Sequence, residues 1–304
     1  MNGVVDTHYV LAMTSLPERI WSAVSWMLPR RFRAAIPIVP VIRLAGVIGI
    51  STPVRPGLTL AACARVLDRA FAVPGARAVA LIINSPGGSA VQSHLIFRRI
   101  RALADQHRLP VVAFVEDVAA SGGYMIACAA DEIVCDEASI IGSIGVVAAS
   151  FGLEKLIEKI GVERRIHTAG ENKVMLDPFL PEKKEDVDRL KAIQGEIHEE
   201  FIGLVKARRG AKIDSRETAL FTGEFWTGLK ARELGLVDAI GDLRSTLRES
   251  YGEKVKTPLI AERSWFGRRS AGIGMMQQLA NSPGLAEDIL ATLEARALWS
   301  RYGL

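Results

Sequence analysis

Residues 78–89 read Ala-Val-Ala-Leu-Ile-Ile-Asn-Ser-Pro-Gly-Gly-Ser. The first six residues form a continuous apolar run, which is typical of a parallel strand that is buried on both faces. A glycine-rich turn follows directly, and the periodicity of residues 89–107 then predicts a helix. This stretch therefore predicts one strand–turn–helix unit of an α/β protein.

The same alternation extends along the chain on both sides of this unit. Apolar runs predict further strands, and amphipathic stretches between them predict helices. The predicted strands are 39–44, 47–50, 110–115, 132–135 and 163–167, and the predicted helices are 59–71, 121–130, 152–160, 181–209 and 285–299.

Composition indicates an ordinary folded protein of 304 residues, with 49% hydrophobic and 24% charged residues. The formal net charge is only +4 and no long Lys/Arg block occurs, which argues against a nucleic-acid partner. Cys63, Cys128 and Cys135 are an odd number of cysteines without metal-ligand spacing. They predict buried, reduced thiols and neither a disulfide framework nor a metal site.

The N-terminal segment 15–33 has the pattern of a short amphipathic helix. Ser15 and Glu18 form a capping box, Trp21 flanks the apolar face, and arginines follow the end of the helix. Such a helix can lie in a membrane interface, and the alternative is a helix docked on its own domain or on a neighbouring subunit. No stretch of the sequence has the length and apolarity expected of a membrane-spanning helix or the pattern of a signal peptide.

A second glycine-rich turn, Ala-Ala-Ser-Gly-Gly-Tyr at residues 119–124, also lies between a predicted strand and a predicted helix. It presents Ser121 among small residues, and the turn at residues 84–89 can supply a backbone N–H that faces it. A nucleophile and an oxyanion hole need this geometry. Neither turn is a phosphate-binding loop, because the Lys-Ser/Thr pair of that motif is absent.

A nucleophilic serine needs a base. None of the five histidines follows a buried strand, although a Ser-His-Asp triad stays open. Three of them are predicted to be surface residues, namely His94, His107 and His198. Lys173 follows a predicted strand and a glycine, and a lysine can act as a base when desolvation keeps it neutral. The alternative for Lys173 is an ordinary loop lysine.

The motifs at residues 84–88, 120–124 and 142–146, followed by the run at 235–241, resemble the signal peptide peptidase A (SppA/SohB-like) family of serine peptidases. The resemblance covers about residues 39 to 245. It implies a crotonase/Clp-like fold, a spiral of β-β-α units. It also implies a Ser-Lys dyad that cleaves apolar peptides such as released signal peptides, without a metal or another cofactor.

Matched residue by residue, Ser121 corresponds to the family's nucleophile and Lys173 to its general base. Gly87 and Gly122 correspond to the backbone donors of the oxyanion hole, and Ser143 corresponds to a hydroxyl that orients the lysine. In short members of this family, rings form in which the lysine reaches the serine of a neighbouring subunit. The resemblance therefore implies a homo-oligomer.

Three regions are predicted: an N-terminal amphipathic segment (1–35), a peptidase domain (36–262) and a C-terminal helical tail (263–304). The tail matches nothing in the family and is expected to make a subunit contact or to enter the active-site groove. The expected location is cytoplasmic, or peripheral on the cytoplasmic face of the inner membrane.

Two other functions fit parts of the sequence. A crotonase-type acyl-CoA hydratase or isomerase would use carboxylates over the site, and Glu116 and Asp117 are the nearest in sequence. A non-catalytic, membrane-associated scaffold ring would need neither Ser121 nor Lys173.

Overall fold

The computed structural model describes residues 36–49, 57–170, 172–213, 218–261 and 285–304. The predicted amphipathic helix within residues 15–33 lies outside these ranges, as does the first part of the C-terminal tail. The three-part division of the chain remains a prediction.

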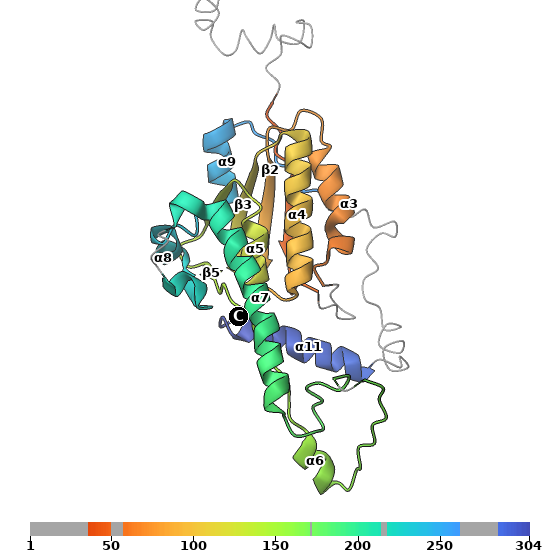
Figure 1. The fold of residues 1–304 in the computed structure, drawn as a ribbon. Helices are drawn as coiled ribbons and strands as arrows, with labels where there is room; N and C mark the ends of the chain where they lie inside the picture. The colour runs from red at the N-terminus through yellow and green to blue at the C-terminus, as the bar shows by residue number, and fades with distance from the viewer. Residues whose placement is uncertain (1–35, 50–56, 171, 214–217, 262–284) are drawn as a thin grey trace, which may run out of the picture.

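Five parallel strands form the main sheet and lie next to one another in the order β1-β2-β3-β4-β7. Because each unit of the chain adds the next strand, the helices between them pack side by side, α3 on α4 and α4 on α5 (Figure 1). This order confirms the α/β class and agrees with a spiral of strand and helix units. The strands are β1 (Val41–Ala45), β2 (Val79–Ser85), β3 (Val111–Ala120), β4 (Glu132–Cys135) and β7 (Ala239–Ile240), and the helices are α3 (Leu60–Phe71), α4 (Ala90–His107) and α5 (Gly122–Ala127).

Both faces of the sheet are covered, which explains the continuous apolar run of β2. Alternate residues of β2, such as Leu81 and Ile83, join the core beneath α3, α4 and α5. Ala80, which points the other way, packs in a second core with Leu247 of α9 (Leu243–Tyr251). A strand with both faces buried does not alternate between apolar and polar residues, and residues 79–83 of β2 are all apolar.

Strand β3 pairs with two different strands along its length. Its first half pairs with β4, and its last three residues pair with β5 (Ile140–Gly142). Exposed Glu116 and Asp117 lie between the halves, where β3 leaves one partner for the other. β5 also pairs antiparallel with β6 (Phe225–Thr227). This branch brings Gly142 beside the end of β3, where Ser121 follows.

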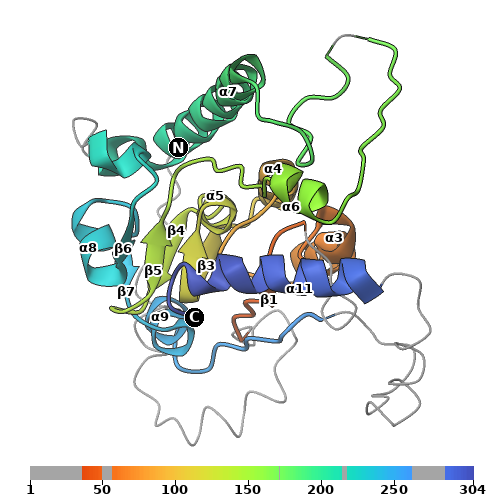
Figure 2. The ribbon, with the colours of Figure 1, turned by 90° about the horizontal axis from the view of Figure 1, so that it is seen from below.

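The rest of the chain extends from the sheet. α7 (Lys184–Arg209) runs beyond its lower edge towards residues 147–170 and 172–183, called the arm, which include α6 (Glu154–Lys159) (Figure 1). α11 (Leu285–Ser300) crosses below the strands (Figure 2). The smaller elements are η2 (Gly210–Lys212), η3 (Thr218–Phe221) and α8 (Gly228–Glu233).

The predicted strand at 163–167 is wrong. These residues lie in the arm without strand pairing, and Arg164 instead forms an ion pair with Asp177 at 2.6 Å. Ile166 is the only aliphatic residue among these five, and an extended segment becomes a strand only where a neighbouring strand accepts its hydrogen bonds. In the described ranges, no helix is long and apolar enough to cross a bilayer.

Candidate active site

Ser121 occupies a one-residue turn between β3 and α5. Its φ of 52° and ψ of −122° lie in a region that non-glycine residues rarely adopt. Strain of this kind costs about 1–3 kcal/mol and persists only where the surroundings enforce it. Here the Ser121 N–H donates to the Gly142 carbonyl at 2.8 Å, and the Ser121 carbonyl accepts from the Met125 N–H at 3.0 Å. These bonds fix the serine at the beginning of α5.

The glycines of this turn allow α5 to approach its neighbours closely. A Cβ on Gly122 would overlap the Ser93 hydroxyl of α4, and a Cβ on Gly123 would lie 2.5 Å from the Ser85 carbonyl oxygen. The two predicted glycine-rich turns therefore meet, because the second packs directly against the first strand and helix.

Gly87 faces the serine from the first turn. Its φ is +101°, and a Cβ there would lie 2.8 Å from the Ser121 Cβ and 3.0 Å from the Gly122 nitrogen. Gly122 is the first residue of α5, so its N–H has no acceptor within the helix. The Gly87 N–H donates to Ser85 Oγ at 3.2 Å. Of the two predicted oxyanion donors, the Gly122 N–H is thus available to an oxyanion. The Gly87 N–H would have to leave Ser85 Oγ before it could donate to one.

Ser143 lies just beyond β5 and is buried. Its N–H donates to the Glu224 carbonyl at 2.6 Å, and its φ is 52°. Its Oγ accepts a hydrogen bond from the Tyr302 hydroxyl at 3.3 Å. The hydroxyl predicted to orient a lysine is therefore occupied by a residue from the C-terminal segment.

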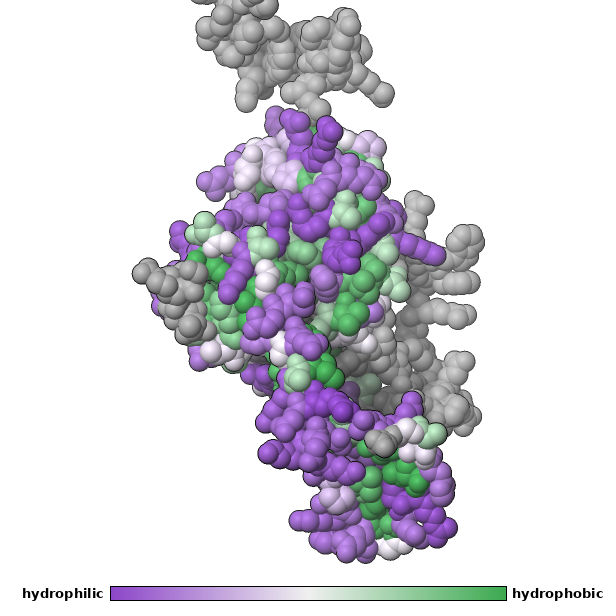
Figure 3. Space-filling model, viewed as in Figure 1, coloured by the Kyte–Doolittle hydropathy of each residue, from purple (hydrophilic) through white to green (hydrophobic). Residues whose placement is uncertain are grey.

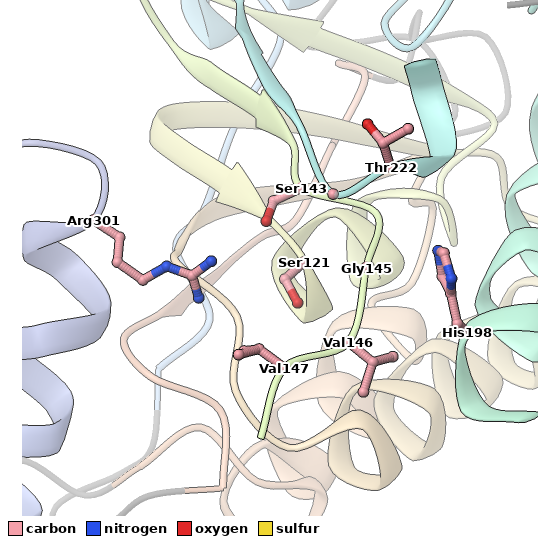
Figure 4. Close-up of a pocket in the computed structure, with 9 residues that line it drawn as sticks. Ser121, Ser143, Gly145, Val146, Val147, His198, Thr222 and Arg301 are labelled. Atoms are coloured by element: carbon pink, nitrogen blue, oxygen red, sulfur yellow. The ribbon is translucent and has the colours of Figure 1, made fainter. Parts of the chain in front are cut away.

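Two cavities open beside Ser121. One, of about 320 Å³, is lined by Ser121 and Ser143 together with His198 and Arg301 (Figure 4). The other, of about 370 Å³, has an apolar wall that Met125, Ile197, Phe201 and Leu298 help to form. Ser121 lines both cavities and is therefore exposed to a ligand in either one.

His198 is a site residue that the sequence did not reveal. The sequence predicts a surface residue, whereas the structure leaves His198 half-buried at the first cavity, with its Nε2 3.1 Å from the Ile144 carbonyl oxygen. The apolar stripe of α7 predicts one covered face, and the structure buries it at Phe201 and Val205 but leaves Ile193 exposed. It does not show that the covered face borders Ser121.

Lys173 lies in the arm and is exposed. Its backbone N–H donates to the Gly170 carbonyl at 3.2 Å, and it lines neither of the cavities beside Ser121. The single chain therefore brings together Ser121, Gly87, Gly122 and Ser143 and leaves Lys173 apart from them.

The carboxylates that a hydratase would need lie in other contacts. Glu116 forms an ion pair with Arg43 at 2.6 Å, and Asp117 accepts from the Asn84 amide nitrogen at 2.6 Å. Both line a separate cavity that Ser121 does not border. In the part of the chain that the structure describes, no three His, Cys, Asp or Glu side chains are placed to hold a metal.

The far end of α5 is held by buried polar contacts. The Arg208 side chain of α7 donates to the Cys128 carbonyl at 2.8 Å, and the Tyr124 hydroxyl donates to the Leu236 carbonyl at 2.7 Å. Arg209, which is 3% exposed, forms an ion pair with Asp238 at 2.8 Å. The 235–241 motif thus holds α5 through Leu236, and Ser121 directly precedes that helix.

A serine on a strained turn at the start of a helix, opposite a glycine turn, is an arrangement in which α/β hydrolases present a nucleophile, and Ser121 is the candidate here. The profile of peptidase family S49 matches residues 104–255, which is half of the chain. The chain belongs to peptidase family S49, a family of serine peptidases.

Two similar proteins carry protease names, and a third carries the name of a transporter. The Arabidopsis thaliana protein named serine protease SPPA, chloroplastic, is 36% identical over 184 residues, 60% of this chain and 27% of that protein. A Synechocystis sp. protein with a protease name is 33% identical over 218 residues, 68% of this chain and 76% of that protein. A Brucella abortus protein named Na(+)/H(+) antiporter NhaA is 53% identical over 301 residues, and the chain spans 41% of its length.

Proposed function

We propose that the chain is a serine endopeptidase in which Ser121 is the nucleophile. The observation that carries the proposal is the strained turn of Ser121, which opens into two cavities and faces Gly87 and the Gly122 N–H. A preorganised N–H beside a serine stabilises the charge of a tetrahedral intermediate. The apolar wall of the second cavity favours apolar peptides, such as released signal peptides.

We further propose that Lys173 is the general base and that a second copy of the chain supplies it. Lys173 is exposed on the arm, away from its own Ser121. The arm also carries an apolar patch (Figure 3), whose exposed members include Phe151 at 76% and Ile160 at 65%. An exposed apolar patch of this kind is typical of a contact with another protein. A ring of copies would bury the patch and desolvate the lysine.

The reaction then runs as an acyl transfer. The Lys173 amine takes the proton from Ser121 Oγ, and Oγ attacks the peptide carbonyl carbon. The Gly122 N–H, and the Gly87 N–H once it leaves Ser85, stabilise the oxyanion. The lysine ammonium gives its proton to the leaving amine, and water hydrolyses the acyl-enzyme. Ser143 Oγ holds the lysine in place throughout. A peripheral position on the cytoplasmic face of the inner membrane is part of this proposal and is supported by the pattern of residues 15–33.

The test is cleavage of an unstructured peptide library by the wild type and four variants. Ser121→Ala and Lys173→Ala are expected to lower kcat/KM by about 10³-fold or more. The matched controls are Ser245→Ala, an exposed serine on α9, and Lys254→Ala, an exposed lysine just beyond α9 and outside the arm. Both controls should cleave like the wild type. Wild-type cleavage by Ser121→Ala would refute the proposal.

A further inference from the structure

The C-terminal segment of residues 298–304 runs into the candidate active site. α11 crosses beneath the strands and ends near β5 (Figure 2). Leu298 lines the apolar cavity, and Arg301 lines both cavities beside Ser121. Figure 4 shows the Arg301 guanidinium directed towards Ser121 and Ser143. Both side chains therefore lie beside the space that a peptide would enter next to Ser121.

Tyr302 anchors this segment at two points. Its hydroxyl donates to Ser143 Oγ at 3.3 Å, and its ring packs edge-on against Phe225 with ring centres 5.1 Å apart and an interplanar angle of 74°. Tyr302 is half-buried, whereas the neighbouring Arg301 and Gly303 are exposed. Tyr302 is therefore more deeply packed than either neighbour. Edge-to-face aromatic pairs favour this geometry.

The same hydroxyl has a role in the proposed mechanism, where it orients Lys173. Ser143 is buried, and its Oγ lies at the wall of the cavity that Arg301 also lines. With the Tyr302 phenol at Ser143 and the Arg301 side chain in the cavity, the position that the lysine would take is filled. The lysine and the segment cannot use this position together.

We propose that residues 298–304 are an autoinhibitory segment that competes with Lys173 and with substrate at the Ser121 site. The inference rests on the proposed function, because it gives Ser143 its place beside the general base. The described conformation is the inhibited one, and the active conformation requires Tyr302 to leave Ser143 and Phe225. Binding of substrate and docking of the arm of a second copy favour that departure.

Kinetics of point variants form the first part of the test. Tyr302→Phe removes one hydrogen bond and keeps the ring, so kcat/KM should rise by about 2- to 12-fold. Tyr302→Ala also removes the aromatic contact with Phe225 and should raise kcat/KM further. Tyr251→Phe is the matched control, because Tyr251 lies on α9, which packs on the other face of the sheet. This variant should leave kcat/KM unchanged. Unchanged or lower kcat/KM in both Tyr302 variants would overturn the proposal.

The second part does not depend on turnover. A fluorescent peptide with the sequence Leu-Trp-Ser-Arg-Tyr-Gly-Leu, that of residues 298–304, is titrated into Ser121→Ala and into Ser121→Ala with Tyr302→Ala. Anisotropy should show tighter binding to the double variant, whose own segment has lost its anchor. Equal affinities of the peptide for the two proteins would refute the proposal that the segment is autoinhibitory. If no protein cleaves peptides and the double variant still binds more tightly, the peptidase proposal fails while occupancy of the site by the segment stands.

Discussion

Replacing Gly87 with alanine tests whether the two glycine-rich turns hold Ser121, the proposed nucleophile, in place. Gly87 has a φ of +101°, so any side chain there is strained. The added Cβ would also lie 2.8 Å from the Ser121 Cβ and 2.9 Å from the Ala120 carbonyl oxygen. Carbon atoms normally approach to about 3.5–4.0 Å, so Ser121 must move by about 0.7 Å or more.

The conformational penalty can be separated from the steric one with a control. Gly75 also has a positive φ, +74°, but a Cβ there would meet nothing within 4 Å. Gly75→Ala should therefore lower the free energy of unfolding by about 1–2 kcal/mol and leave activity unchanged. Gly87→Ala should lower the free energy of unfolding by the same amount and by about 1–3 kcal/mol more, because of the overlap.

The displacement of Ser121 should also reduce catalysis. A nucleophile misplaced by about 1 Å loses about 10²-fold in rate, so kcat/KM of Gly87→Ala should fall by that order. Urea unfolding and peptide cleavage measure the two effects on the same preparation. If Gly87→Ala matches Gly75→Ala in stability and retains wild-type activity, the turns do not position Ser121 in the manner described.

Two further predictions concern titrating groups. Burial alone would raise the pKa of Asp238, but hydrogen bonds, first from Arg209, hold that pKa below its ordinary value. Its contribution to stability is present above about pH 4 and is lost as the pH falls further. The free energy of unfolding, measured with urea at several pH values, should therefore fall less steeply below about pH 4 in Asp238→Asn than in the wild type. Burial raises the pKa of Cys63 to about 11, and that of Cys128 and Cys135 to about 12. A thiol reagent at pH 8 should therefore label none of the three until urea unfolds the chain, and rapid labelling of the native protein would contradict their burial.

The sequence was sufficient to predict the turns that form the candidate site. Ser121 and Gly87 each follow a buried strand, and the carboxyl ends of neighbouring parallel strands share one edge of a sheet. Local sequence patterns therefore predict that Ser121 and Gly87, which are far apart in the chain, lie close together in the fold. The strands β5 and β6, with three residues each, were not predicted, because so short a run has no detectable period.

Long-range placement accounts for the residues that the sequence did not reveal. His198 enters the site because of the direction in which α7 crosses the domain, which its own periodicity does not specify. Tyr302 meets Ser143 across 159 residues of chain, and no local signal marks either partner for the other. The sequence leaves two alternatives for the tail, a subunit contact or entry into the active-site groove. The contacts of Tyr302 and Arg301 support the second alternative.

Mixing two inactive variants tests the central claim, a site shared between copies, most directly. Ser121→Ala and Lys173→Ala are each purified, combined in equal amounts, dissociated and allowed to reassemble, and peptide cleavage is compared with that of the wild type. If Lys173 serves the Ser121 of another copy, about one quarter of the sites contain both native residues, and about that fraction of activity should return. A mixture no more active than either variant alone, alongside an active wild type treated in the same way, would contradict a shared site.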